Sequence, residues 1–282
     1  MVFCTYKYIL RSGFGGFLIT ILFNNKLYIP QSFCFIMSAT KPFVLNVYGL
    51  VPVYNVCNQT LREVFRFPNF SMAHVMMDVH EVSQLHEHRK MKEFYFITQG
   101  DGIFFSADKS FRVGEGGFFI VPKNTPHKLR NLGKERLEHL VFASPPFNSK
   151  DVFELYDDIS RPMSQGQESD KKPFTALDGA VVYELDSAEE RQENGFGFAY
   201  GHLGPLRKAK FHFHNISDEV YYVLSGEGKV RLDNLTSPIK KGSVIYVPIG
   251  VKHGLENTSE EELRVLCFST PEYKEGDFIL TE

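Results

Sequence analysis

Three histidines and one glutamate in the C-terminal half have the residue types and the spacing of a metal site. His212 and His214 lie two positions apart, so on a β-strand both imidazoles leave the same face. Glu219 opens the next strand-like run, EVYYVL, and His253 follows the pattern SVIYVP and a turn. Three imidazoles and a carboxylate suit Mn, Fe, Ni, Co or Zn, and they do not suit Cu(I) or an iron–sulfur cluster. The segment therefore predicts a divalent transition-metal site built on strands.

A second set of three histidines and one glutamate lies upstream, in the same order. Its members are His86, His88, Glu93 and His127, and each precedes its counterpart by 126 positions. The same offset relates four pairs of turn residues: Gly100 and Gly226, Gly116 and Gly242, Pro122 and Pro248, and Asn131 and Asn257. A register kept at eight pairs of positions indicates an internal duplication. We predict up to one metal ion in each copy, with Mn or Fe preferred, because buried histidine and glutamate side chains need partners. The alternative is that these polar residues only fill a barrel end.

The pattern H-x-H-x4-E-x6-G, followed by G-x5-P-x-G-x2-H-x3-N, is that of the cupins. The chain resembles a bicupin over roughly residues 43 to 282. Asn124 departs from the pattern, because the family has glycine there, as at Gly250. Asparagine tolerates a positive φ better than other non-glycine residues, so we expect the turn to keep its shape. The resemblance implies an all-β fold of two tandem jelly-roll (double-stranded β-helix) barrels. It also implies that such barrels pack against one another or that the chain forms a homodimer.

Short apolar runs between turn residues support this fold class. Runs such as EFYFITQG and GGFFIVP in the first copy, and EVYYVL and SVIYVP in the second, are rich in Phe, Val, Ile and Tyr. We predict a first cupin domain over 37–147, a polar linker over 148–172 with one short helix at KDVFELYDD, and a second cupin domain over 173–282. The tail EYKEGDFILTE shows no further motif.

Residues 1–36 differ from the rest. They contain the hydrophobic run GFGGFLITILF after Lys7 and Arg11, which is typical of a signal peptide, but no small-x-small cleavage site follows. A membrane span needs about 20 residues, so none is predicted. Three interpretations compete: an uncleaved targeting segment, an N-terminal hairpin, or an extension upstream of a protein that begins at Met37. We favour the third, because the duplicated unit starts just after it.

Composition restricts the partners. The net charge of −3 and the absence of basic clusters argue against a nucleic-acid partner. The four cysteines have no paired spacing, which favours a reducing compartment, and we predict a cytoplasmic protein. We expect its partner to be a small-molecule substrate, because the only catalytic signature found is the metal pattern.

Four neighbours share the strand parity of the ligands and are predicted to point inward as catalytic groups: Gln84, Tyr95, Lys210 and Tyr221. A tyrosine could donate a proton or a hydrogen bond to a bound oxygen, and Lys210 could hold a carboxylate or a phosphate. The alternative is that the tyrosines fill the barrels and that Lys210 extends to the barrel mouth. His202 lies opposite Met76 in the duplication, so we expect it to pack rather than to bind metal.

Three functions are compatible with the pattern. The first is an Fe or Mn oxidoreductase, a dioxygenase or an oxalate-type enzyme, that acts on a small polar or anionic metabolite. The second is a redox-neutral isomerase or lyase for a sugar phosphate or a keto acid, similar to cupins labelled as mannose-6-phosphate isomerases. The third is a non-catalytic binding or storage protein. The sequence leaves open which barrel is catalytic, since the second has the fuller motif and the first has the basic loop Arg89, Lys90 and Lys92, with Arg130 nearby.

Overall fold

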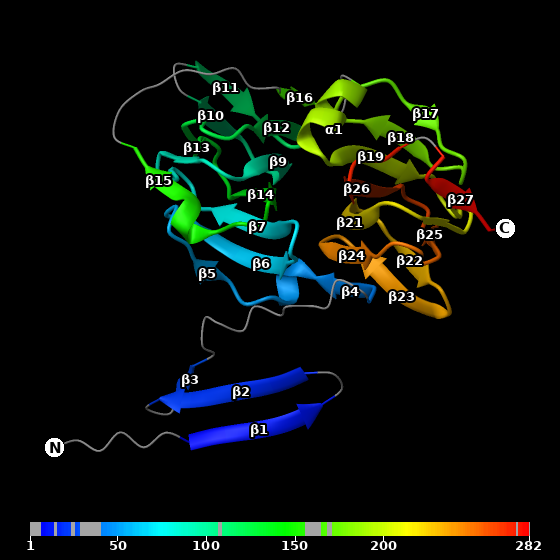
Figure 1. The fold of residues 1–282 in the computed structure, drawn as a ribbon, viewed down its shortest axis with the longest axis horizontal. Helices are drawn as coiled ribbons and strands as arrows, with labels where there is room; N and C mark the ends of the chain where they lie inside the picture. Colours follow the sequence, from blue (N-terminus) through cyan, green and yellow to red (C-terminus); the bar gives the residue numbers. More distant parts are fainter. Residues whose placement is uncertain are drawn as a thin grey trace. The chain divides into compact units, whose positions relative to one another are not determined.

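A computed structural model describes residues 7–13, 16–23, 26–28, 41–106, 109–155, 165–167, 171–274 and 276–281. The chain forms two compact units, residues 1–36 and residues 37–282. The first unit is an antiparallel sheet of β1 (Lys7–Gly13), β2 (Gly16–Phe23) and β3 (Lys26–Tyr28), as Figure 1 shows. The hydrophobic run therefore lies mainly in strand β2. The predicted start at Met37 lies outside the described residues.

Two antiparallel sheets form the first barrel. The larger has the order β16-β12-β9-β14-β7-β6-β5, and the smaller has the order β11-β10-β13-β8-β15. The strands are β5 (Val53–Tyr54), β6 (Thr60–Arg66), β7 (Ser71–Met77), β8 (His86–His88), β9 (Lys92–Gln99), β10 (Gly102–Ser106), β11 (Lys109–Val113), β12 (Gly117–Val121), β13 (His127–Asn131), β14 (Leu137–Ser144), β15 (Val152–Glu154) and β16 (Gln165–Gln167).

The second barrel repeats this arrangement. Its sheets have the orders β17-β18-β19-β26-β21-β24-β4 and β23-β22-β25-β20-β27. The strands are β4 (Phe43–Asn46), β17 (Phe174–Thr175), β18 (Val181–Glu184), β19 (Gly197–Leu203), β20 (His212–His214), β21 (Asp218–Ser225), β22 (Glu227–Leu232), β23 (Leu235–Lys240), β24 (Ser243–Val247), β25 (His253–Asn257), β26 (Leu263–Thr270) and β27 (Phe278–Leu280). The prediction of two jelly-roll barrels is confirmed.

Two strands cross the boundaries that the duplication suggested. β4 comes before the first barrel in the sequence, yet it pairs with β24 of the second barrel, from Phe43↔Tyr246 to Asn46↔Ser243. A 3₁₀ turn, η1 (Val47–Gly49), follows it. β16 lies within the predicted linker and pairs with β12 of the first barrel. β4 therefore lies in the sequence of the predicted first domain but pairs with the second barrel, and β16 lies in the predicted linker but pairs with the first barrel.

The prediction of a short helix at KDVFELYDD is wrong. Its described part is a 3₁₀ turn, η2 (Ser149–Asp151), followed by β15, which pairs with β8. Residues 156–158 lie outside the described residues. The one α-helix in the described part of the chain was not predicted: α1 (Ala188–Asn194) has a capping box between Ser187 and Glu190. No described helix is both long enough and apolar enough to cross a bilayer.

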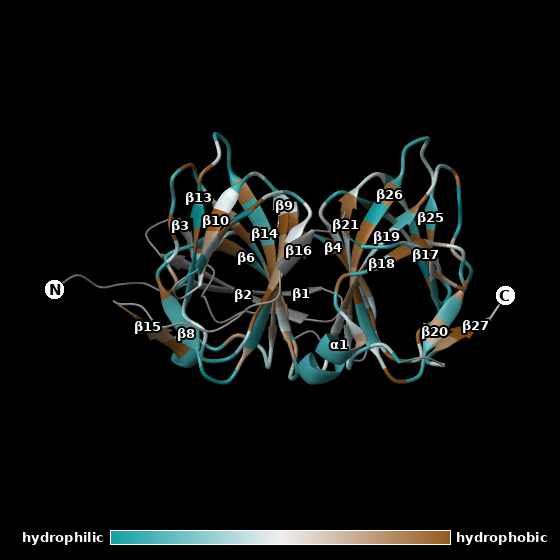
Figure 2. Cartoon of the chain, turned by 90° about the horizontal axis from the view of Figure 1, so that it is seen from above, coloured by the Kyte–Doolittle hydropathy of each residue, from teal (hydrophilic) through white to brown (hydrophobic). Residues whose placement is uncertain are grey.

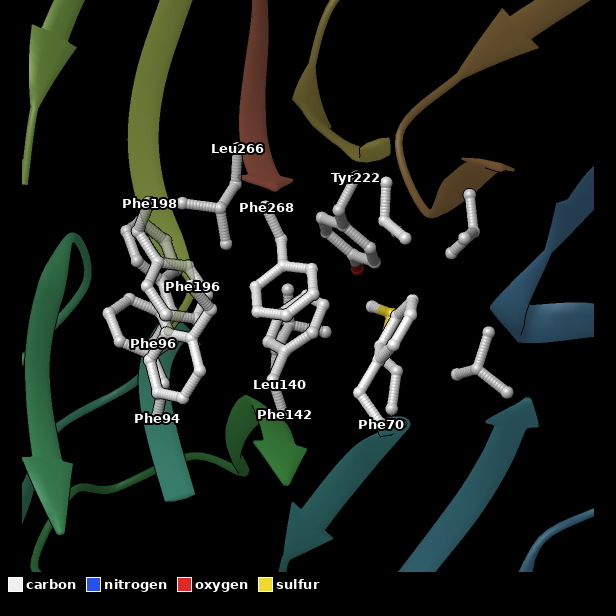
Figure 3. Packing of buried hydrophobic residues seen from close by; sticks show 14 of the residues in the cluster. Phe70, Phe94, Phe96, Leu140, Phe142, Phe196, Phe198, Tyr222, Leu266 and Phe268 are labelled. Carbon is white, nitrogen blue, oxygen red and sulfur yellow. The ribbon is translucent and has the colours of Figure 1, made fainter. Parts of the chain in front are cut away.

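Aromatic side chains fill the space between the two barrels. Phe94 of the first barrel stacks on Phe198 of the second, and Phe142 stacks on Phe268 with ring centroids 4.8 Å apart (Figure 3). All four are buried in one hydrophobic cluster that draws on strands of both barrels. Figure 2, coloured by hydropathy, shows hydrophobic residues along the strands of the two neighbouring barrels. This shared core explains the use of many phenylalanines.

Candidate metal centres

Three strands, two from the smaller sheet and one from the larger, position the four residues of the second barrel. His212 and His214 leave the same face of β20, Glu219 lies near the start of β21, and His253 opens β25, where it pairs with His212. The Glu219 Oε2 atom lies 3.2 Å from His214 Nε2 and 2.9 Å from His253 Nε2. All four side chains are buried, and their ligand atoms lie within 4.8 Å of one another.

The first barrel contains an equivalent group. His86 and His88 lie on β8, Glu93 lies on β9 and His127 opens β13, paired with His86. Glu93 Oε2 lies 3.4 Å from His88 Nε2 and 3.3 Å from His127 Nε2. These four residues are also buried, with ligand atoms within 4.8 Å of one another. The structure thus brings together both sets that the sequence predicted.

In each barrel, the turn before the third histidine, His127 or His253, is hydrogen-bonded to the strand that carries the H-x-H motif. The Gly250 N–H donates to the His214 carbonyl at 2.7 Å, and the Asn124 N–H donates to the His88 carbonyl at 2.6 Å. Gly250 has a φ of 79° and Asn124 has a φ of 55°. Asparagine therefore takes the left-handed conformation in place of glycine, as predicted.

Backbone carbonyls fix the orientation of most of these imidazoles. The Nδ1 of His212 donates to the Lys210 carbonyl at 3.0 Å, and the Nδ1 of His86 donates to the Gln84 carbonyl at 2.7 Å. Carbonyls of residues 125, 151 and 251 accept from the Nδ1 atoms of His127, His88 and His253. Because Nδ1 carries the proton, Nε2 presents its lone pair to the centre of each group.

The Nε2 atoms of His88, His127 and His214 are buried and make no hydrogen bond. An unsatisfied buried polar atom is destabilising by about 1–3 kcal/mol, and a divalent cation among the four side chains would satisfy all of them. Three imidazole nitrogens and a carboxylate therefore fit a transition metal in each barrel.

The protonation states favour a cation. Burial by itself would raise the pKa of Glu219, but the neighbouring His214 and His253 outweigh it and hold the pKa of this carboxyl well below its usual range. Burial, reinforced by neighbouring histidines, lowers the pKa of His86 and that of His212 to about 3. Ionised glutamate and neutral imidazole are the forms that bind metals. Burial would lower the pKa of His88 and that of His214 as well, but the charges of Glu93 and Glu219 outweigh it and raise both, so a bound cation would replace a proton on these two histidines.

The two predicted tyrosines lie at the sites. The Tyr221 hydroxyl donates to Glu219 Oε2 at 2.7 Å and lies 3.2 Å from His253 Nε2. The Tyr95 hydroxyl donates to Glu93 Oε2 at 3.0 Å. Burial raises the pKa of both tyrosines well above the usual value, so both keep their protons at neutral pH. Their catalytic roles stay predictions.

The structure does not place the side chain of Lys210 or that of Gln84 in a cavity, and their catalytic roles stay predictions. The Lys210 side chain is exposed, Gln84 is only half-buried, and neither is among the residues that line the cavities described below. Parity failed because regular strand begins only at His86 and His212, two positions later. Each residue contributes its backbone carbonyl instead, as a hydrogen-bond acceptor for the first histidine.

Two acidic residues that the sequence reasoning missed support the ligand loops. The Asp277 carboxylate accepts hydrogen bonds from the backbone N–H groups of residues 215, 216 and 217, between His214 and Glu219. Asp151 accepts from residues 89, 90 and 91 in the first barrel. The offset of 126 relates these two aspartates, so the duplication itself contained the signal. It was missed because one lies in the predicted linker and the other in the tail.

The cavities beside the two groups differ in size. The second barrel holds a cavity of about 460 Å³, and the first holds one of about 140 Å³. Smaller side chains explain the difference, because the second barrel has Gly201 where the first has Val75, and Val265 where the first has His139. His202 lines the larger cavity, with its Nδ1 atom 3.3 Å from Glu262, and it belongs to neither four-residue group.

Comparison with known proteins defines the class. A family model described as "Cupin domain" matches residues 73–142 and again 199–269, and the chain belongs to this family, with two cupin domains in tandem. It is 34% identical over 111 residues to the uncharacterized protein MJ1618 of Methanocaldococcus jannaschii, which covers 39% of this chain and 89% of that protein.

Two further relatives have named activities. Acireductone dioxygenase of a Sulfurihydrogenibium species is 24% identical over 131 residues, 45% of this chain and 69% of that protein. A structure of Bacillus subtilis oxalate decarboxylase, solved in work on its Mn(II) centres, superimposes with a TM-score of 0.66 at 19% identity, over 84% of this chain and 78% of that one. The structural likeness shows the bicupin fold.

Proposed function

We propose that the chain is a metal-dependent oxidoreductase whose reaction takes place in the second barrel. The observation that carries the proposal is the cavity of about 460 Å³ that reaches His212, His214, Glu219 and His253. The first barrel offers its equivalent group only about 140 Å³. A substrate needs room beside the metal, so we assign catalysis to the second site and a structural role to the first.

The residues of the second site have separate tasks. His212, His214, His253 and Glu219 would hold Fe or Mn. The bound ion would supply open positions for substrate oxygen atoms and for dioxygen. Tyr221 keeps its proton, so its hydroxyl can donate a hydrogen bond to Glu219 or to an oxygen atom of the substrate beside it.

The cavity lining favours a substrate that is less polar than the sequence suggested. Its wall is largely apolar and includes Phe198, Leu203 and Val265. Arg191, the one lysine or arginine among the described lining residues, is bound to Glu184 Oε2 at 3.1 Å. A phosphate or a dicarboxylate would find no free cationic side chain among the described lining residues, and the metal would be its one cationic partner. We therefore propose a substrate with a metal-binding oxygen group and an apolar body, which disfavours oxalate and sugar phosphates.

Similarity to an acireductone dioxygenase supports the choice of oxygen chemistry. The test is oxygen uptake by the Fe- or Mn-loaded protein with a panel of oxygen chelators that carry apolar bodies, such as enolisable diketones. We expect oxygen consumption that His214→Ala abolishes and His88→Ala leaves largely intact. Turnover at the same rate without oxygen would instead support the isomerase or lyase, and binding without product would support the binding protein.

A further inference from the structure

Each barrel has a hairpin turn that reaches its metal group. In the first barrel the turn spans residues 55–59, between β5 and β6, and in the second it spans 176–180, between β17 and β18. Both turns are closed by the same backbone hydrogen bond at 2.9 Å, from the N–H of the first residue to the carbonyl of the fifth. The fourth residue of each, Asn58 or Gly179, has a positive φ.

The third residue of the turn is Cys57 in the first barrel and Asp178 in the second. The Cys57 carbonyl accepts from the Gln84 N–H, and the Asp178 carbonyl accepts from the Lys210 N–H, both at 2.9 Å. Gln84 and Lys210 are equivalent in the duplication, so Cys57 and Asp178 occupy the same place. The two barrels therefore present different chemical groups at one structural position, a thiol and a carboxylate.

The Cys57 thiol contacts one ligand of the first site, and it lies outside the group of four whose ligand atoms are all within 4.8 Å of one another. Its side chain is buried, and its Sγ atom is 3.6 Å from the Nε2 of His86, the nitrogen that faces the centre of the group. A sulfur about 2.3 Å and a nitrogen about 2.1 Å from one ion are separated by about 3.1–3.6 Å when they subtend about 90–110°. The observed separation of Cys57 Sγ and His86 Nε2 lies at the upper end of this range, so ligation of one metal by both requires the sulfur to move slightly toward the centre of the group.

Buried unsatisfied nitrogens at the same centre provide an independent observation. The Nε2 atoms of His88 and His127 make no hydrogen bond, although both side chains are almost completely buried. The other described cysteine, Cys267 in the second barrel, has a different contact. Its Sγ atom lies 3.5 Å from Glu219 Oε1, the oxygen that faces away from the histidines.

We propose that Cys57 is a fifth ligand of the metal in the first barrel, so that this site combines three imidazoles, a carboxylate and a thiolate. As the sulfur–metal bond forms, the thiol proton leaves to solvent, and no oxidant is required. The proposal rests on the metal binding proposed above for the first barrel. A thiolate ligand favours softer ions and occupies a coordination position. The two sites consequently differ in metal preference, and the first is more closed to substrate.

Cobalt(II) provides a test that does not depend on turnover. The metal-free full-length protein is titrated with Co²⁺, and the near-ultraviolet thiolate-to-cobalt band is recorded together with the visible bands of bound cobalt. The wild type and Cys267→Ser should both show the thiolate band. Cys57→Ser should lose the band and bind one of its two equivalents at least about tenfold more weakly. His214→Ala, which retains only the first site, should keep the band with a single equivalent.

The outcomes separate this proposal from the proposed function. Visible cobalt bands without a thiolate band in the wild type would overturn Cys57 ligation and leave metal binding intact. Failure to bind cobalt at all would overturn both proposals. The visible bands from the second site show that Cys57→Ser is folded, so its loss of the thiolate band reports ligation rather than unfolding.

Discussion

Gly201→Val tests whether the larger cavity binds the substrate. Gly201 lies on β19 and lines the cavity, and the equivalent residue of the first barrel is Val75. A Cβ atom at position 201 would meet its nearest neighbours, Val265 Cγ2 and the Val181 carbonyl, at 3.6 and 3.8 Å. These are ordinary van der Waals contacts, so a Cβ atom fits there, and the two γ carbons of valine would take up part of the cavity that Gly201 lines.

The expected effects on stability and on activity have opposite signs. Replacing glycine within a strand stabilises the fold by about 0.5–1 kcal/mol. Each methylene-sized group that a pocket cannot accommodate is worth about 1–3 kcal/mol of substrate discrimination, and valine adds three carbon atoms. We therefore expect kcat/KM to fall by at least about tenfold, while the free energy of unfolding stays equal or increases and two equivalents of metal are retained.

The assays are oxygen uptake with the substrate found in the screen, urea unfolding and elemental analysis. Val75→Ala in the first barrel is the matched control, and it should reduce stability while leaving kcat/KM unchanged. An unchanged kcat/KM in a fully metal-loaded Gly201→Val protein would refute the assignment of this cavity to the substrate.

Three further predictions concern the core, the ligand loops and pH. Phe268→Ala, at the barrel interface, should lower the free energy of unfolding in urea by about 3–5 kcal/mol. The reason is that the buried ring packs on Phe70, Phe142 and Phe198. A loss below about 1 kcal/mol would contradict a shared core. Asp277→Ala should weaken metal binding at the second site by about 10–100-fold in a competition titration and spare the first, and Asp151→Ala should do the reverse. Because the pKa of Glu219 is depressed in the folded protein, its carboxylate stabilises the fold above the unfolded pKa of about 4.5, and this stabilisation is lost as the pH falls below that value. The free energy of unfolding of the metal-free Glu219→Gln protein should therefore fall less steeply with acid than that of the wild type. Equal slopes would argue against the ion pair.

The duplication made the fold and the metal groups predictable. Strand alternation places two histidines of an H-x-H motif on one face, and the common offset placed Glu93 and Glu219 beside them. Parity failed for Lys210, because it assumes a regular strand that begins only at His212. The exchange of β4 into the second barrel's sheet was also missed, because strand pairing between distant segments leaves no periodic signal.

The correspondence between Cys57 and Asp178 was hidden by an insertion. The offset of 126 pairs Cys57 with Tyr183, whereas the hairpin turns correspond at an offset of 121. Helix α1 lies between the hairpin and the next strand of the second copy, and the extra residues there shift the register. The difference in cavity volume had a signal in the sequence, since Gly201 stands where the first barrel has Val75, but its meaning depends on knowing that both positions line the cavities.

Metal content is the most direct test of the central claim. The wild type, His88→Ala and His214→Ala are purified without chelator, loaded with Mn or Fe and analysed for bound metal per chain. We predict two equivalents in the wild type and one in each variant, with the remaining equivalent in the barrel that was not mutated. A wild type that binds no metal, or variants that both retain two equivalents, would contradict the assignment of these eight residues as ligands.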